Sequence, residues 1–179
     1  KTIDNQASIG VIGMGVMGQG IAINCCKNGF ETAVYNRFIK GEKTVVFNFL
    51  SKHPNIKNLH GFIDLLSFIR ALKRPRKIWL MIKSGTAIDT IIDEILPFLD
   101  ELDVIIDGGN SHYKDTQRRE KALKKHCVNY VGCGVSGGEI GARKGASLMF
   151  GGSKKAYNIL TPILNAISAK DNSGKPCQL

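Results

Sequence analysis

The chain has 179 residues, of which 43% are hydrophobic, and a formal net charge of +10 at pH 7. This length suits one globular domain, and no apolar run approaches the roughly 20 residues that cross a bilayer, so a membrane-spanning protein is not expected. The basic residues fall in separate short groups without interleaved aromatic residues, which argues against a nucleic-acid-binding module, while charge alone does not choose between an anionic membrane surface and an anionic small molecule.

Short apolar runs alternate with segments of helical period along the chain, a pattern typical of a parallel sheet covered by helices. We expect strands, in chain order, at residues 9–12, 32–35, 78–82, 104–106 and 130–131. The predicted fold class is therefore α/β, with a doubly wound, mostly parallel, Rossmann-like sheet. A single dinucleotide-binding domain would span residues 1–179.

Two helices are predicted after the third of these strands. Apolar residues recur at helical spacing as far as Leu99, in a helix whose start resembles a capping box formed by Thr86 and Asp89. A second helix is expected over residues 114–125, where charged residues dominate and one side should be exposed. Its inner face would consist of Ala122 and Leu123.

A glycine cluster, GMGVMG, follows the first predicted strand and precedes a helical run. It fits the pattern G-x-G-x-x-G, in which Gly13 allows a tight turn, Gly15 lets the backbone approach a pyrophosphate and Gly18 allows close helix packing. The unpaired N–H groups at the helix N-terminus would bind the anion. The cluster therefore predicts a dinucleotide-binding loop.

The second predicted strand ends in VYNR, about where a dinucleotide-binding unit usually has a carboxylate that holds a ribose diol. Asn36 and Arg37 stand there instead, and a guanidinium suits an additional phosphate on that ribose. This favours NADP over NAD, unless Arg37 is an ordinary surface arginine. Lys40 and Lys43 either add positive charge to the site or are solvated surface residues.

A third motif, GVSGG, fits both a glycine-rich anion-binding loop and the nucleophile elbow of serine hydrolases. The elbow requires a helix directly after the serine, and GGEIGARKG is too rich in glycine to begin one readily. We therefore expect a flexible loop in which backbone N–H groups and the Ser136 hydroxyl can bind an anion. The glycine-rich segments 13–20, 108–109 and 132–152 each follow a predicted strand, so all three are expected to face one site.

The five cysteines form an odd number without a CxxC pair, and the four histidines have no partners at ligand spacing. This predicts neither a disulfide framework nor a metal site. The first residues lack the apolar segment of a secretory signal. We expect a cytoplasmic protein.

Five segments occur in an order and spacing that resemble the amino-terminal domain of the decarboxylating 6-phosphogluconate dehydrogenase family. They are IGVIGMGVMGQGIAIN, YNR, MIKSGTAID, IIDGGNSHYKDTQRR and GCGVSGGEIGARKGASLMFGG. DGGNSHYKDTQRR and GVSGGEIGAR are the specific ones, because related β-hydroxyacid dehydrogenases share the dinucleotide loop and a shorter Ser-Gly-Gly segment.

The resemblance implies an NADP-dependent enzyme of the pentose phosphate pathway that oxidatively decarboxylates 6-phosphogluconate to ribulose 5-phosphate. The pyrophosphate would be held by Gly13, Met14, Gly15, Val16, Met17 and Gly18, and the adenosine phosphate by Asn36, Arg37 and Phe38. The rest of the cofactor would lie against Ile82, Lys83, Ser84 and Asn110. The substrate would contact Asn110, Ser136, Gly137 and Gly138.

The family's general base lysine and general acid glutamate belong to a helical domain that would follow Leu179 and form a homodimer, so no catalytic residue is expected in this chain. This chain also departs from the family at Phe38, where a hydroxyl residue is common, at Gly15, which replaces a frequent alanine, and at Phe150, which replaces a proline. Two alternatives remain open. They are a β-hydroxyacid dehydrogenase of the 3-hydroxyisobutyrate type, which DGGNSHYKDTQRR disfavours, and a non-catalytic dinucleotide-sensing module.

Overall fold

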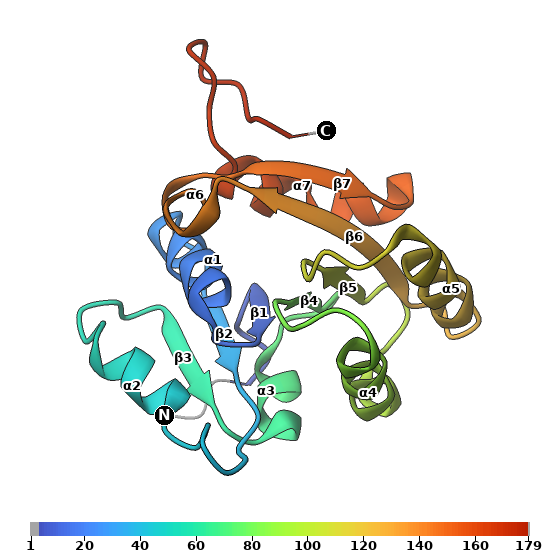
Figure 1. The fold of residues 1–179 in the computed structure, drawn as a ribbon, viewed down its shortest axis with the longest axis horizontal. Coiled ribbons are helices and arrows are strands. Elements are labelled where there is room, and N and C mark those ends of the chain that lie inside the picture. The colour runs from blue at the N-terminus through green and yellow to red at the C-terminus, as the bar shows by residue number, and fades with distance from the viewer. Residues whose placement is uncertain (1–3, 179) are drawn as a thin grey trace.

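A computed structural model describes residues 4–178, which form one seven-stranded sheet with helices on both faces (Figure 1). The strands are β1 (Ile9–Ile12), β2 (Thr32–Tyr35), β3 (Leu59–Phe62), β4 (Lys77–Leu80), β5 (Val104–Asp107), β6 (Asn129–Ser136) and β7 (Ser147–Gly151). The helices are α1 (Val16–Lys27), α2 (Val45–Ser51), α3 (Leu65–Ala71), α4 (Thr86–Ile95), the short 3-10 helix η1 (Leu96–Phe98), α5 (Tyr113–Lys124), α6 (Gly138–Lys144) and α7 (Lys154–Ile167).

The strand order is β3-β2-β1-β4-β5-β6-β7. Strands β1 to β6 run parallel, and β7 pairs antiparallel with β6 at one edge. The chain winds outward in one direction from β1 to β3 and in the other from β4 onward, so the order reverses between β1 and β4. This confirms the predicted doubly wound sheet, in which ligands bind outside the carboxyl ends of the strands at the reversal point.

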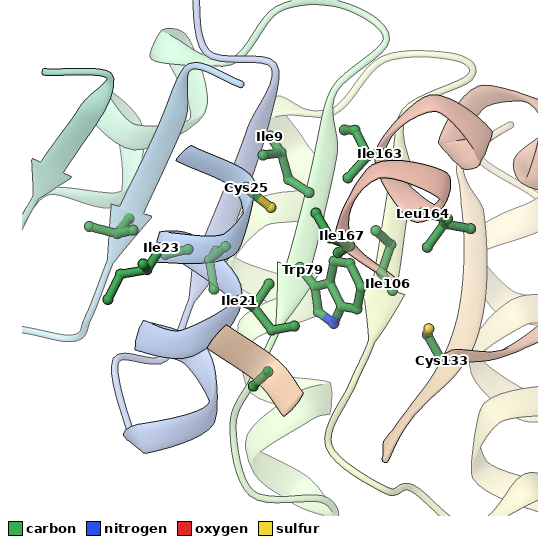
Figure 2. Close-up of a cluster of buried hydrophobic side chains, with 14 of the residues drawn as sticks. Ile9, Ile21, Ile23, Cys25, Trp79, Ile106, Cys133, Ile163, Leu164 and Ile167 are labelled. Carbon is green, nitrogen blue, oxygen red and sulfur yellow. The ribbon is translucent and has the colours of Figure 1, made fainter. Parts of the chain in front are cut away.

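Two apolar cores hold the helices against the sheet. Helices α1, α2, α6 and α7 cover one face, and α3, α4 and α5 cover the other. On the first face Trp79 of β4 is fully buried, with Ile21 of α1 and Ile167 of α7 beside it (Figure 2). Both faces of the central strands are therefore packed, so a ligand can reach the sheet only at the ends of its strands.

The central strands were predicted well and the edges were not. Strands β1 and β2 have the predicted bounds, and β4 and β5 differ from prediction by one or two residues at their ends. Strand β6 continues to Ser136, well beyond the expected residues 130–131, and β3 and β7 were not predicted. Part of the glycine-rich segment 132–152 therefore lies within β6 and β7 rather than after a strand.

Two predictions about helices α4 and α5 are wrong. The capping box is absent, because α4 begins after Gly85 without a side-chain cap and the Asp89 carboxylate binds arginines of α5 instead. On α5 Ala122 is exposed, and the inner face consists of Leu123 and Arg119.

The segment after Ser136 is a helix rather than a flexible loop. Helix α6 begins at Gly138 although the segment is rich in glycine, and the small residues serve a close contact between helices. A Cβ at Gly20 of α1 would lie 2.9 Å from the Cβ of Ala142. Tertiary packing therefore overrides the low helix propensity of glycine here. No helix within residues 4–178 combines the length and the hydropathy needed to cross a membrane.

Candidate dinucleotide-binding site

The glycine cluster forms the turn between β1 and α1. Gly13 has a φ of 99°, which glycine adopts readily, and a Cβ there would lie 2.5 Å from the Met81 carbonyl oxygen. A Cβ on Gly18 would collide with the carbonyl oxygen of Gly13, so α1 approaches the turn at backbone distance. A Cβ on Gly15, in contrast, would meet no atom within 4 Å. The backbone at Gly15 therefore faces open space directly before the first turn of α1.

The N-terminus of α1 keeps free hydrogen-bond donors. Gly15 is its N-cap and supplies no side-chain acceptor for the first-turn N–H groups. Such groups and the helix dipole together favour an anion. One neighbouring N–H is already used, because Met14 donates its backbone N–H to Asn36 Oδ1 at 3.0 Å.

At the end of β2 an acidic residue joins the predicted residues. Asn36 is buried and donates from Nδ2 to Glu42 Oε2 at 2.8 Å. Arg37 donates from Nη2 and Nε to Glu42 Oε1, at 2.6 and 3.0 Å, so the guanidinium holds a carboxylate. Lys43 Nζ lies 5.6 Å from the centre of the Phe38 ring. The loop after β2 therefore folds back over the strand end and brings Glu42 with it.

These elements border a cleft of about 630 Å³ over the carboxyl ends of β1, β2 and β4. Most of the residues predicted to hold the cofactor meet there. The cleft is lined by Gly13, Met14 and Gly15 of the turn, Asn36, Arg37, Phe38 and Glu42 after β2, Ile82 and Lys83 after β4, and Ala87, Thr90, Ile91 and Glu94 of α4. It lies at the point where the strand order reverses, and its backbone N–H groups and arginine suit an anionic ligand.

The predicted substrate residues lie outside this cleft. Asn110 lines a second cavity of about 490 Å³ bordered by β5, α5, β6 and β7. Ser136 ends β6, and Gly137 and Gly138 turn the chain into α6 with φ values of 125° and 60°. The two cavities do not include these three residues. The sequence analysis predicted that the three glycine segments face one site, but neither of these two cavities is lined by all three.

The loops after β4 and β5 nevertheless lie against each other. A Cβ at Gly109 would be 2.5 Å from the Ile82 carbonyl oxygen, and one at Gly108 would be 2.5 Å from the Trp79 indole nitrogen. Gly109 is therefore required by close approach of the Ile82 backbone, and Gly108 by close approach of the Trp79 side chain. Asn110 follows with a positive φ of 58°, and the Gly109 N–H donates to the Asp107 carboxylate at 3.0 Å.

Arg119 of α5 holds the loops after β4 and β5 in place through hydrogen bonds. Its side chain is only 2% exposed and makes a two-pronged contact with Asp89 of α4, from Nε at 2.9 Å and from Nη2 at 3.0 Å. The same guanidinium donates to the carbonyl oxygen of Gly85 at 3.0 Å and to Ser111 Oγ at 3.2 Å. One buried arginine thus connects the loop after β4, helix α4 and the loop after β5.

A buried carboxylate completes this cluster. Asp107 is 1% exposed, accepts a hydrogen bond from the Tyr130 hydroxyl at 2.6 Å and lies 3.6 Å from Arg119 Nη1. Burial, and then the hydrogen bond to Asp107, raise the pKa of Tyr130 well above its usual range, so its hydroxyl remains a donor at neutral pH. The Arg119 guanidinium, and then that of Arg118, lower the pKa of Asp89 to about 2.

Neither the serine nucleophile considered above nor a cysteine nucleophile gains support from this geometry. Burial raises the pKa of Cys133 to about 12, which keeps the thiol protonated. Helix α6 does follow Ser136 as an elbow would require, but the four histidines lie elsewhere in the chain, at positions 53, 60, 112 and 126, all before the serine. Residues 4–178 contain no cluster of three potential metal ligands.

Sequence reasoning missed Glu42 and the Arg119 cluster. Glu42 is the only acidic residue between Tyr35 and Val45, which was a signal that could have been used. Arg119 lies four residues before the buried Leu123, on the same side of α5, so its inward position was also readable. Its pairing with Asp89, 30 residues away, could not be read from local spacing.

Comparison with known proteins agrees with this geometry. Residues 8–175 match the protein-family model described as the NAD binding domain of 6-phosphogluconate dehydrogenase. The chain is 48% identical over 173 residues to the NADP(+)-dependent, decarboxylating 6-phosphogluconate dehydrogenase of Bacillus subtilis. The matched region covers 97% of this chain and 36% of that protein. The chain spans about a third of the length of the curated relatives it matches.

Solved structures give the same result. Plasmodium falciparum 6-phosphogluconate dehydrogenase, studied with its cofactor NADP+ and its substrate 6-phosphogluconate, has a TM-score of 0.87 and 39% identity over 96% of this chain and 36% of its own. Mycobacterium tuberculosis 3-hydroxyisobutyrate dehydrogenase has a TM-score of 0.77 at 17% identity, over 97% of this chain and 54% of its own. The second likeness shows a shared fold alone.

Proposed function

Because this chain belongs to the family of 6-phosphogluconate dehydrogenase NAD-binding domains, we propose that it binds NADP as part of an enzyme that oxidatively decarboxylates 6-phosphogluconate. The product would be ribulose 5-phosphate, in the pentose phosphate pathway. The observation that carries the proposal is Arg37 at the end of β2, in the same cleft as the glycine turn. The NADP dependence of the Bacillus subtilis relative and the NADP+ bound by the Plasmodium falciparum enzyme support the choice of cofactor.

The residues present fit such a cofactor. The open space beside Gly15 leaves room for a pyrophosphate against the backbone and the free N–H groups of α1. Arg37 is 64% exposed and is therefore accessible to the adenosine phosphate, while Ile82 and Lys83 line the other end of the cleft. The nicotinamide supplies the hydride acceptor when it is bound. This chain's own residues would orient it through the contacting loops after β4 and β5, with Ser84 and Asn110 beside it.

The substrate would lie where Asn110, Ser136, Gly137 and Gly138 approach it, as the resemblance implies. Only Asn110 lines either of the two cavities described above, so the proposal requires a further wall from outside residues 4–178. Chemistry also requires the substrate to be held about 3–3.5 Å from the nicotinamide. We therefore expect the 179-residue chain to bind NADP without producing NADPH, with the catalytic lysine and glutamate supplied by a dimeric helical domain. A cytoplasmic location would suit this metabolism.

The proposal is tested by titrating the chain with NADP and with NAD. We expect tighter binding of NADP, and we expect Arg37→Ala to weaken NADP by roughly ten- to a hundredfold, the range for a hydrogen bond to a charged group, while NAD changes little. Arg74→Ala is a matched control, because Arg74 is 65% exposed and also paired with a carboxylate, Asp100, but lies outside the cleft. Equal losses for both cofactors would show that Arg37 does not recognise the phosphate.

Activity separates the whole enzyme from the isolated chain. NADPH formed from 6-phosphogluconate by this chain alone would contradict the proposed need for a further domain. A 3-hydroxyisobutyrate-type enzyme shares the fold, and NADPH formation by the whole enzyme with 6-phosphogluconate or with 3-hydroxyisobutyrate as substrate distinguishes the two. A dinucleotide-sensing module would respond to neither acid.

A further inference from the structure

The arginine assigned to the adenosine phosphate already holds an anion of this chain. Glu42 Oε1 accepts hydrogen bonds from both Nε and Nη2 of Arg37, at 3.0 and 2.6 Å. Its other oxygen, Oε2, accepts from Asn36 Nδ2 at 2.8 Å. Both oxygens of one carboxylate therefore accept hydrogen bonds from the two residues that directly follow β2.

Glu42 stands at the cleft and not on a remote surface. It lines the same cavity as the glycine turn, and Asn36 connects it to that turn through the hydrogen bond from the Met14 N–H. The Arg37 side chain is 64% exposed and that of Glu42 is 31% exposed. Ion pairs of this exposure are weak, so an incoming anion can displace the carboxylate from the guanidinium.

We propose that Glu42 is a specificity-determining residue, which competes with the adenosine phosphate for Arg37 and thereby lowers the preference for NADP over NAD. This inference rests on the proposed function, because it requires that the cleft binds these cofactors. NADP must break the Arg37–Glu42 pair to place its adenosine phosphate on the guanidinium. NAD lacks that additional phosphate and can bind with the pair intact.

Two physical effects act in the same direction. A displaced carboxylate that stays near the site repels a phosphate carrying close to two negative charges. The same carboxylate is suited to accept a hydrogen bond from a ribose hydroxyl, which is the role that acidic residues after the second strand have in NAD-binding units. The loop thus supplies the acid that the strand end lacks.

The test is the ratio of the dissociation constants for NAD and NADP in Glu42→Gln. Glutamine keeps an oxygen that can accept from Asn36 while it removes the charge. We expect the ratio to rise about tenfold in favour of NADP, from release of the ion pair and loss of repulsion. In an Arg37→Ala background the same substitution should raise the ratio by less than it does in the wild type, because release of the ion pair no longer contributes and only the loss of repulsion remains.

Glu94→Gln is the matched control. Glu94 is exposed and lines the same cleft, so its substitution removes one negative charge from the same cavity without touching Arg37. A general charge effect would raise the ratio equally in both variants, and that result would overturn the inference.

The remaining outcomes are also decisive. An unchanged or lower ratio in Glu42→Gln would mean that Glu42 merely orients Arg37, and would overturn the inference while wild-type binding of NADP upheld the proposed function. If the wild-type chain bound neither cofactor, the proposed function and the inference would fail together.

Discussion

The two arginines that serve this site are paired with carboxylates in opposite ways. Arg37 is 64% exposed, and its partner Glu42 comes from the same loop, five residues later. Arg119 is 2% exposed, and its partners come from α4 and from the loops after β4 and β5, between 8 and 34 residues away. An exposed local pair can open for a ligand, whereas a buried long-range cluster holds its loops in one arrangement.

Burial explains the difference in energy as well as in mobility. Solvent weakens an exposed pair, so replacing one partner with a ligand costs little. A buried pair can contribute little in net terms, yet removing one partner leaves an uncompensated charge and costs several kcal/mol. The cluster at Arg119 therefore belongs to the folded framework, and the pair at Arg37 belongs to recognition.

The largest expected effect is at Arg119. Arg119→Ala leaves the buried Asp107 and the half-buried Asp89 without their shared cation, so the free energy of unfolding should fall by about 3–5 kcal/mol. Urea denaturation followed by tryptophan fluorescence measures this through Trp79. Arg118→Ala is the control, because the neighbouring side chain is 56% exposed and binds the same Asp89. It should lose no more than about 1 kcal/mol, and similar losses in both variants would remove the distinction between buried and exposed pairs.

A smaller effect is expected at the other side of Asp107. Tyr130→Phe removes the hydroxyl that donates to this carboxylate at 2.6 Å, so the free energy of unfolding should fall by about 1.5–3 kcal/mol, the range for a hydrogen bond to a charged group. Tyr113→Phe, at a side chain that is 61% exposed, should be neutral in the same denaturation experiment. A neutral Tyr130→Phe would mean that Arg119 alone satisfies Asp107.

How far the sequence predicted the molecule depends on the same division between local and long-range features. β1 and β2 were placed correctly because each is a short apolar run with a turn residue directly after it, Gly13 after β1 and Asn36 after β2. These signals lie within a few residues of each strand. Neither β3 nor β7, the two edge strands, was predicted: LHGF lacks a continuous apolar run, and the short run LMF of β7 lies within the glycine-rich segment 132–152.

The site divides in the same way. The glycine turn was readable because two of its requirements are local, namely the positive φ of Gly13 and the collision that a Cβ on Gly18 would make with the Gly13 carbonyl oxygen. The helix at Gly138 was not, because its glycine-rich sequence is stabilised by contact with α1, which lies more than a hundred residues earlier. The ion pairs of Arg119 depend on the sheet order in the same manner, and only a three-dimensional arrangement places Asp89 beside it.

Acid titration sharpens the comparison from the side of Asp89. Its pKa is lowered from 3.8 to about 2, by Arg119 and then Arg118, so the stability it contributes is present above about pH 4 and is lost as the pH falls from 4 toward 2. Asp89→Asn should therefore be less stable than the wild type at pH 6, by about 1 kcal/mol for this partly exposed carboxylate, and the difference should shrink toward pH 2. Asp93→Asn, at an exposed position of the same helix, should give a difference near zero. A gap between wild type and Asp89→Asn that stays constant from pH 6 to pH 2 would contradict the assignment.

The smallest effect is expected at Phe38, which follows Arg37 of the exposed pair. Phe38 is 46% exposed and lines the cleft, and Lys43 Nζ lies over its ring. Phe38→Thr places a hydroxyl beside the phosphate that Arg37 is proposed to hold, so NADP should bind about two- to tenfold more tightly relative to NAD, a small gain for a hydrogen bond to a charged group because the loop is exposed to solvent. Phe38→Ala separates the hydroxyl from loss of the ring and release of Lys43. If alanine and threonine gave the same gain, the benefit would come from freeing the lysine, and recognition at this end of the cleft would depend on charge rather than on hydrogen-bond geometry. If only threonine gave the tighter binding of NADP, a single added hydrogen-bond donor would be enough to raise the affinity of the exposed loop. The buried cluster at Arg119 could not gain affinity in this way, because its donors already bind three elements.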